Sequence, residues 1–363
     1  MKSVVFYVSG HGFGHSSRMA EVIRVLLRDS PDIAVTVKTS APEWFYRESI
    51  SSPFRFVRRE CDTGVVQSDS LNLDPRRTLE DFAAGAWGSA SFLEKELRSL
   101  RTIKPDLIVG DIPPVAFAVA ETAGLPSLAI ANFSWDWIYE PYVEEYPEYR
   151  HLIPFIRDAY GKADRLLRLP FWCPMTAFPR VTDLPLIARR AELEKNEIRE
   201  ILGLPPDLKV VLLSFGGFWL GEEYYRKLAK LKSFVWIASE RVGGGFPGIQ
   251  NFSREKVKRA GLIYPDLVKA SDVVVTKPGY GILSECIANR TRMIYTSRGD
   301  FREYDVLVAG AKKYLPSLFI SQEKLKAGEL KDSLEEVLSL KDDYPSLPLD
   351  GAEVAAKIIA NGY

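Results

Sequence analysis

Two glycine-rich turns that each follow a short apolar run are the places where this chain could do chemistry. The first turn, Gly10–His15, follows residues 4–8, and the second, Lys277–Glu285, follows residues 273–275. Glycine lets a ligand approach the backbone N–H groups at the start of a helix, where anions bind. Two such strand–turn–helix units predict two sheets facing each other across a cleft, in an enzyme for a phosphorylated or sugar ligand.

The first turn presents two imidazoles, His11 and His15, at the carboxyl end of a strand, where open α/β sheets bind their ligands. Near neutral pH, histidine can take a proton from an attacking hydroxyl. Asp111 ends the buried run 107–110 and is expected at the same sheet edge, where a carboxylate would orient the imidazole. We interpret His15 as the candidate base and Asp111 as its partner. Helix capping or packing is the structural alternative for each.

Two familiar phosphate-binding motifs do not fit. Gly14 comes one position too early for the dinucleotide fingerprint, and the second strand ends without an acidic residue. Gly161-Lys162 lacks the hydroxyl residue of a P-loop, and the chain contains no Asp-x-Asp motif. We therefore expect neither a metal nor a resident cofactor. Helix N-termini and loop amides would have to neutralise a leaving diphosphate.

The second turn carries a carboxylate, Glu285, at least one turn into the helix that follows. It could accept two ribose hydroxyls while the amides of the turn meet phosphates. The loop Ser214–Gly217, after the apolar run 210–213, is a candidate second phosphate cradle. A solvated helix face and a plain strand-to-helix turn are the respective alternatives.

Two further clusters could bind an acceptor. Asn132–Tyr139 mixes aromatic rings with Asn and Asp after a predicted strand, which is typical of a carbohydrate platform and equally of core packing. Cys61–Asp69 is a polar segment without helical or strand periodicity, either a substrate loop or an ordinary turn. The predicted acceptor contacts are His11, Asp62, Gln67, Asp69, Asn132, Trp135 and Asp136.

Short β-rich runs alternate with longer helical segments, which predicts α/β architecture with parallel sheets. In the first half we expect strands at 4–8, 34–38, 54–58, 106–110, 126–131 and 165–168, and helices at 16–28, 78–102 and 114–123. A proline-rich, turn-rich stretch follows residue 169, and the pattern then restarts with a helix at 191–202 and strands near 209–214, 233–238, 272–276 and 292–296. This predicts an acceptor-side Rossmann-like domain at 1–185, a donor domain at 186–345 and a final helix within 346–363 that packs on a domain.

Composition limits the partners. The 48 basic and 48 acidic residues of this 363-residue chain balance, whereas nucleic-acid binders usually carry a basic excess. No apolar run approaches the roughly 20 residues that span a bilayer, and no signal-peptide pattern is visible. The three cysteines are widely spaced. We expect a cytoplasmic protein with free thiols and no nucleic-acid partner, and neutral charge is compatible with peripheral membrane contact.

These features together resemble the GT-B glycosyltransferases, which have two doubly wound Rossmann-like domains. Gly14-His15 resembles the Gly-His of UDP-sugar transferases, whose histidine is the base, and Asp111 resembles the aspartate that orients it. The segment 279–285 resembles the donor motif, and Arg298–Glu303 lies where those enzymes contact the donor sugar. The donor contacts implied are Gly12, Gly14, Gly216, Gly217, Tyr264, Gly279, Tyr280, Gly281, Ser284, Glu285, Phe301, Arg302 and Glu303.

A closer resemblance covers nearly the whole chain: it is similar to the glycosyltransferase-like N-terminal half of plant L-arabinokinases. The segments that carry it are 10–15, 61–69, 132–139, 173–175 and 277–285. No kinase activity is carried over from that resemblance. Lys277-Pro278 stands where plant UDP-sugar transferases have His-Cys, so the chain departs from their donor motif at this end.

The sequence therefore predicts an inverting, metal-independent glycosyltransferase that uses a nucleotide-diphosphate sugar, most simply a UDP-sugar, and a hydroxyl acceptor. An alternative is a nucleotide-sugar epimerase on the same fold, with Asp62, Asp69 and Glu303 as further acid and base groups. Another is a nucleotide-sugar sensor without chemistry, which would not need a base such as His15.

Overall fold

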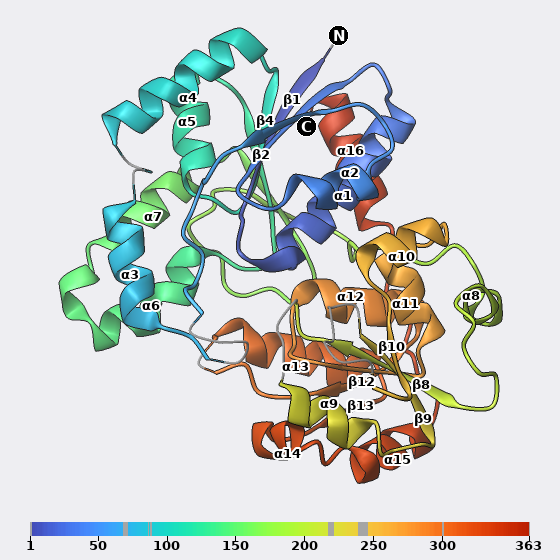
Figure 1. Ribbon diagram of the computed structural model, residues 1–363. Helices are drawn as coiled ribbons and strands as arrows, with labels where there is room; N and C mark the ends of the chain where they lie inside the picture. Colours follow the sequence, from blue (N-terminus) through green and yellow to red (C-terminus); the bar gives the residue numbers. More distant parts are fainter. Residues whose placement is uncertain are drawn as a thin grey trace.

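The protein consists of two lobes, each built on a parallel β-sheet that is covered by helices (Figure 1). The computed structural model describes residues 2–67, 72–85, 87, 89–216, 221–238, 246–299 and 301–362. The predicted fold class, two doubly wound parallel sheets, is confirmed.

The N-terminal sheet has the strand order β3-β2-β1-β4-β5-β6-β7, and its pairs are parallel. Its strands are β1 (Ser3–Val8), β2 (Ala34–Thr39), β3 (Arg55–Arg58), β4 (Leu107–Asp111), β5 (Ser127–Ala131), β6 (Arg165–Arg168) and β7 (Val181–Asp183). The central strands are continuous apolar runs because helices cover both faces of a parallel sheet. Those helices are α1 (Gly12–Asp29), α2 (Glu43–Ser49), α3 (Pro75–Ala84), α4 (Ala90–Ile103), α5 (Val115–Ala123), α6 (Trp135–Glu145) and α7 (Leu152–Gly161), with a short 3₁₀ turn, η2 (Pro147–Tyr149), between the last two.

The C-terminal sheet repeats this topology with the order β10-β9-β8-β11-β12-β13. Its strands are β8 (Lys209–Ser214), β9 (Phe234–Ala238), β10 (Ile249–Asn251), β11 (Val273–Thr276), β12 (Arg292–Tyr295) and β13 (Ser317–Phe319). The helices of the second half are α8 (Lys195–Ile201), α9 (Glu222–Leu228), α10 (Arg254–Arg259), α11 (Tyr264–Ala270), α12 (Tyr280–Asn289), α13 (Glu303–Tyr314), α14 (Gln322–Ala327), α15 (Lys331–Ser339) and α16 (Gly351–Asn361).

Each sheet has a point where the strand order reverses, between β1 and β4 in one lobe and between β8 and β11 in the other. Loops diverge at such a point and leave a crevice at the carboxyl ends of the strands. The turn 10–15 leaves β1 and the turn 277–285 leaves β11, so both glycine turns start at these crevices. In the register, Val8 at the end of β1 pairs with Asp111 at the end of β4.

Two local predictions are wrong. The helix expected over 78–102 is two helices, α3 and α4, because Gly85 leaves the helical conformation after α3 and the Ser89 hydroxyl caps α4 by accepting from the Phe92 N–H at 3.2 Å. In the proline-rich, turn-rich stretch after residue 169 no strand is predicted, but the structure has β7 there, which extends the first sheet beside β6.

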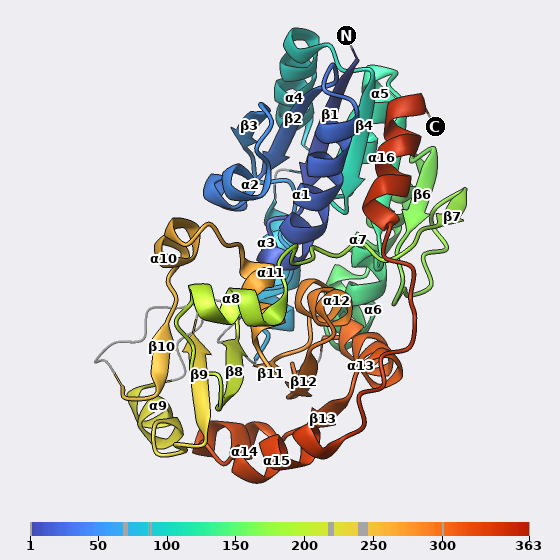
Figure 2. The same ribbon diagram turned by 90° about the vertical axis from the view of Figure 1, so that its right-hand side faces the viewer.

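The last helix returns to the first lobe. After α15 the chain runs back along the molecule, and α16 packs against α1 (Figure 2). The Lys2 ammonium donates to the carbonyl oxygens of Ile359 at 2.6 Å and Ala360 at 3.1 Å, which fastens the end of α16 to the start of the chain. Among the described residues, no helix combines the length and apolar character that a membrane span requires.

Candidate active site

A cavity of about 1190 Å³ lies between the two lobes, and both glycine turns line it. Ligand pockets for single small molecules usually measure about 300–1,000 Å³, so this cavity is larger than most of them. Of the predicted site residues, those that line it are His11, Gly12, Gly14, His15, Asp62, Gln67, Gly216, Tyr264, Gly279, Tyr280, Gly281, Glu285, Phe301 and Glu303.

The two glycine turns touch each other across the lobes. A methyl group added at Gly281 would come within 3.4 Å of the Gly14 Cα, and one added at Gly14 within 3.7 Å of the Gly281 nitrogen. Helices α1 and α12 therefore begin side by side at the cavity. Two helix N-termini at one place create a region of positive potential suited to an anion.

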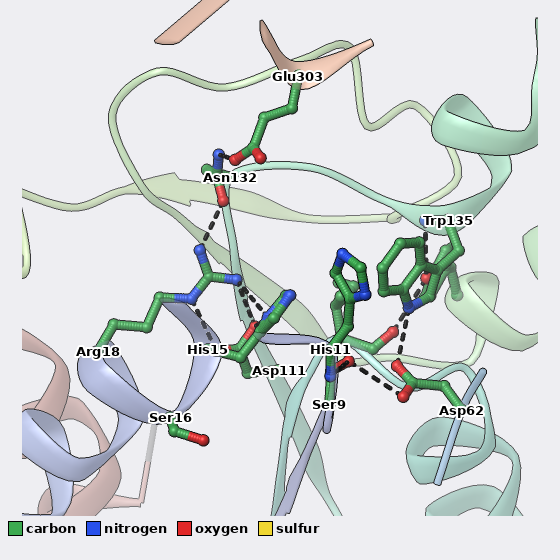
Figure 3. Close-up of polar contacts among 12 residues, drawn as sticks. Ser9, His11, His15, Ser16, Arg18, Asp62, Asp111, Asn132, Trp135 and Glu303 are labelled. Atoms are coloured by element: carbon green, nitrogen blue, oxygen red, sulfur yellow. Dashed lines mark hydrogen bonds and ion pairs between the residues drawn. The ribbon is translucent and has the colours of Figure 1, made fainter. Parts of the chain in front are cut away.

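On the N-terminal wall, His15 is buried and lies beside the carboxylate that ends β4 (Figure 3). Its Nδ1 is 2.9 Å from Asp111 Oδ1. If Nδ1 carries the proton and donates to Asp111, the lone pair of Nε2 is free to accept a proton. The pair thus has the atoms of a general base and its orienting group.

Arg18, one turn after His15 on α1, also binds Asp111. Its Nε donates to Asp111 Oδ2 at 2.7 Å and its Nη2 to Oδ1 at 2.5 Å, while Nη2 lies 3.0 Å from His15 Nδ1. Burial by itself would raise the pKa of Asp111, but the charges of Arg18 and His15 outweigh it and hold that pKa below its usual value. The carboxylate therefore stays ionised and paired with the Arg18 guanidinium.

The Arg18 guanidinium is connected to the C-terminal lobe by hydrogen bonds through the side-chain amide of Asn132. Arg18 Nη1 donates to Asn132 Oδ1 at 2.6 Å, and Asn132 Nδ2 donates to Glu303 Oε1 at 2.7 Å and to the Phe171 carbonyl at 3.3 Å. Asn132 follows β5, whereas Glu303 begins α13 (Figure 3). The Asn132 amide is therefore occupied by a bridge between the lobes, behind the cavity wall rather than on it.

A second carboxylate, Asp62, lines the cavity near His15. It accepts hydrogen bonds from the Ser9 hydroxyl at 3.0 Å and the Trp135 indole N–H at 2.9 Å. Burial raises the pKa of Asp62 to about 6, against the smaller lowering effects of His15 and these two donors. Asp62 is thus an acid–base group that titrates close to neutral pH.

On the opposite wall, Glu285 of α12 is buried and already has partners. Its Oε1 accepts from Arg189 Nε at 2.8 Å, from Arg189 Nη2 at 2.6 Å and from the Ser17 hydroxyl at 3.1 Å. Ser17 belongs to α1, so this carboxylate also joins the lobes. At the neighbouring turn, the hydroxyls of Ser214 and Tyr264 are 2.7 Å apart.

Two cations of the donor lobe complete that wall. Lys277 Nζ donates to Gln67 Oε1 at 3.2 Å across the lobes. Arg298 is 12% exposed, lies 4.1 Å over the Phe301 ring and has Glu303 at 3.7 Å. Burial lowers the pKa of Arg298. Arg298 Nη1 also donates to the Pro278 carbonyl at 3.3 Å. A buried cation whose carboxylate partner among the described residues is as far as 3.7 Å is well placed to receive an anionic ligand.

The remaining predicted residues lie elsewhere. Trp135 and Ser284 are buried behind the wall, the latter with its hydroxyl donating to the Tyr280 carbonyl at 2.6 Å. Asp136 accepts from Arg157 at 2.9 Å, and Arg302 donates to the Trp137 carbonyl at 2.7 Å, so neither lines the cavity. Asp69 and Gly217 lie outside the described residues.

Sequence reasoning missed two arginines at this site, Arg18 and Arg189, whereas Arg298 begins the segment 298–303 that was expected at the donor sugar. A signal for Arg18 was available, because residues three apart share one face of a helix and Arg18 follows His15 by three. Arg189 lies 96 residues from Glu285 in the chain, and no local pattern links them.

Comparisons with known proteins agree with this architecture. A family model described as glycosyl transferase family 1 matches residues 2–195. L-arabinokinase of Arabidopsis thaliana is 35% identical over 361 residues, 98% of this chain, and the chain spans 34% of the length of that protein. A spinosyn rhamnosyltransferase structure superposes with a TM-score of 0.64 at 10% identity, covering 99% of this chain and 95% of the other. UGT2 of Phytolacca americana, solved with UDP-2-fluoro-glucose and pterostilbene, gives 0.59 at 14% identity, covering 99% and 94%. These likenesses confirm the predicted GT-B architecture.

Proposed function

The chain belongs to glycosyl transferase family 1, and we propose that it moves a sugar from a UDP-sugar to a hydroxyl group of an acceptor, with inversion and without a metal. One observation carries the proposal. His15, with Asp111 beside it, lines the cavity from the N-terminal lobe, and the turn that begins α12 lines the same cavity from the C-terminal lobe. A base on one side and an anion site on the other are what a displacement at a sugar carbon requires.

In the proposed reaction, His15 Nε2 takes the proton of the acceptor hydroxyl while that oxygen attacks the anomeric carbon. The bond from that carbon to the diphosphate breaks on the opposite face, and the electron pair leaves with the diphosphate. Asp111 keeps the ring oriented and stabilises the imidazolium as it forms. Attack and departure on opposite faces invert the configuration at the anomeric carbon.

The donor would lie with its diphosphate at the start of α12, near Lys277 and Arg298. Two helix N-termini and these two side chains supply the positive charge that a departing diphosphate requires. Glu285, oriented by Arg189 and Ser17, would accept the ribose hydroxyls. UDP is proposed because the structural relative from Phytolacca americana was solved with a UDP-sugar analogue.

Ligand binding tests the donor directly. UDP, GDP, TDP and their sugars should be compared as ligands by calorimetry and by thermal shift. A nucleotide that binds should stabilise the folded protein, by about 2.7 kcal/mol when its concentration is 100 times the dissociation constant. We expect a uridine compound to bind most tightly. A protein that none of these nucleotides stabilises would contradict the proposed function.

The His15→Ala variant tests the base. General base catalysis contributes about 10²–10⁴-fold, so sugar transfer to a responsive member of a panel of hydroxyl acceptors should fall by that factor. Donor affinity in calorimetry should stay unchanged, because the ring acts on the acceptor. His151→Ala, at an exposed histidine, is the matched control. Transfer at the wild-type rate by His15→Ala would remove this residue from the mechanism.

Epimerisation of a nucleotide sugar without an acceptor is the second candidate, and Asp62 favours it. With a pKa raised by burial to about 6, this carboxyl could exchange protons near neutral pH on the wall that also carries His15. Incubation of the donor alone, followed by NMR, separates the two functions. A new epimer formed without acceptor would support epimerisation, whereas an unchanged donor that is consumed only with an acceptor would support transfer.

A further inference from the structure

His11, the N-cap residue directly before α1, is held in one orientation by the loop after β3. The Val65 N–H donates to His11 Nδ1 at 3.2 Å. Gly64 has a φ of +67°, and a methyl group there would lie 2.5 Å from the His11 Cβ, so glycine allows this close contact. Because Nδ1 accepts a hydrogen bond, the proton of the neutral ring is on Nε2.

That Nε2–H is a buried donor without a hydrogen-bond partner among the described residues. An unpaired buried donor costs about 1–3 kcal/mol, so native proteins rarely leave one without a reason. His11 lines the cavity between the lobes, and its ring stands between His15 and Trp135 (Figure 3). Its ring centroid is 5.7 Å from Trp135 and 6.0 Å from Phe301. A ligand atom that enters this part of the cavity can supply the missing acceptor.

The charged groups around His11 indicate the charge of the ligand atom that would accept this hydrogen bond. Burial, then the charges of Arg298, His15 and Lys277, lower the pKa of His11 well below its usual value. The ring therefore stays neutral and can donate a hydrogen bond but cannot serve as a proton shuttle at neutral pH. The cationic side chains of Arg298 and Lys277, together with the N-terminus of α1, favour a negatively charged oxygen as its partner.

We propose that His11 donates a hydrogen bond from Nε2 to an oxygen of the phosphate next to the sugar in the nucleotide-sugar donor. This inference rests on the proposed function. When the bond between that phosphate and the anomeric carbon breaks, the electron pair stays on the phosphate oxygen, and the acceptor proton goes to His15. His11 keeps its own proton and stabilises the departing charge. The two histidines of the first turn thus have separate tasks.

Imidazole NMR tests the tautomer without any ligand. The chain has three histidines, so long-range ¹H–¹⁵N spectra of the labelled protein are simple, and His11→Gln assigns the His11 signals by their disappearance. We expect a protonated Nε2 and an unprotonated Nδ1 in His11 of the wild type. Addition of UDP should shift the Nε2 resonance, and UMP should shift it much less. A protonated Nδ1, or equal shifts with UDP and UMP, would overturn the proposal.

Two variants separate the donor hydrogen bond from the contact with Val65. In His11→Gln the side-chain N–H₂ lies near the position of Nε2, whereas in His11→Asn the amide reaches only the position of Nδ1. Hydrogen bonds to charged groups contribute about 1.5–3 kcal/mol, or about 10–100-fold. His11→Asn should therefore bind UDP at least about tenfold more weakly than wild type, and His11→Gln within about threefold. UMP affinity should change in neither.

The outcomes distinguish this inference from the proposed function. Equal affinity of wild type and His11→Asn for UDP, or equal losses in both folded variants, would overturn the inference alone. A wild-type protein that binds no nucleoside diphosphate would overturn the proposed function and the inference with it. If His11→Asn fails to fold, the UDP-induced shift of the wild-type Nε2 resonance decides the question.

Discussion

Replacing Arg18 by methionine should destabilise the protein strongly, because Arg18 is the main charge partner of a buried carboxylate. Arg18 is 2% exposed, binds both oxygens of Asp111 and donates to Asn132. Methionine keeps much of the volume but leaves Asp111 with His15 alone. Removal of one partner from a buried ion pair costs about 3–5 kcal/mol, and we expect a loss of that size in the free energy of unfolding at pH 8.

The size of this loss should depend on pH. In the wild type the pKa of Asp111 is depressed, so the stabilisation from its charge is fully present above the unfolded value of about 3.9 and is lost below it. Without Arg18, burial would raise the pKa of Asp111, and a proton could neutralise the carboxylate in mild acid. The stability gap between wild type and variant should therefore narrow from pH 8 to pH 5, by up to about 1.4 kcal/mol per pH unit where only the variant takes up the proton.

Urea unfolding at pH 8, 6.5 and 5, followed by circular dichroism, measures this gap. Arg24→Met is the matched control, because Arg24 lies on the same helix, is 37% exposed and pairs with Glu21 at 2.7 Å. A surface pair of this kind contributes about 0.2–1 kcal/mol. A gap below about 1 kcal/mol for Arg18→Met at pH 8, or one that is constant over the pH range, would refute the reasoning.

Three further substitutions test other parts of the cavity. Burial raises the pKa of Asp62 to about 6, so the wild-type protein loses stability as the pH rises from about 4 through 6. Asp62→Asn lacks this titration, so its free energy of unfolding in urea should rise relative to wild type by up to about 3 kcal/mol over this pH range. A difference that stays constant with pH would contradict this. Lys277→Met should weaken UDP binding about tenfold in calorimetry, because a cation at the start of α12 is lost, and unchanged affinity would remove Lys277 from the phosphate site. Gly64→Ala should lower the free energy of unfolding by about 2 kcal/mol, because the added methyl group would lie 2.5 Å from the His11 Cβ. The same clash should shift the NMR signals of the His11 ring. A variant whose His11 signals match those of the wild type would refute this.

Much of the fold could be predicted because its signals are local. The apolar runs that became β1, β4, β8 and β11 are continuous, as buried parallel strands require, and the glycines after β1 and β11 mark the turns. The split between α3 and α4 was missed because helical periodicity continues through Gly85, and the break depends on two residues.

The short strands were harder to predict. Strands β7, β10 and β13 have three residues each and carry no periodicity that distinguishes them from turns. They form because a neighbouring strand in the sheet offers an edge to pair with, and the sequence of the segment does not contain that information.

The sequence by itself determined that two strand–turn–helix units, with His15 in one and Glu285 in the other, form this protein. Only the tertiary structure decided which polar side chains meet: Glu285 with Arg189, and Asn132 with Glu303, 171 residues away. Buried strands and turns are recognised from residues that are close together in the chain, so the sequence alone is enough to predict them. Ion pairs and hydrogen bonds act over a few ångströms, and the orientation of the two lobes sets those distances.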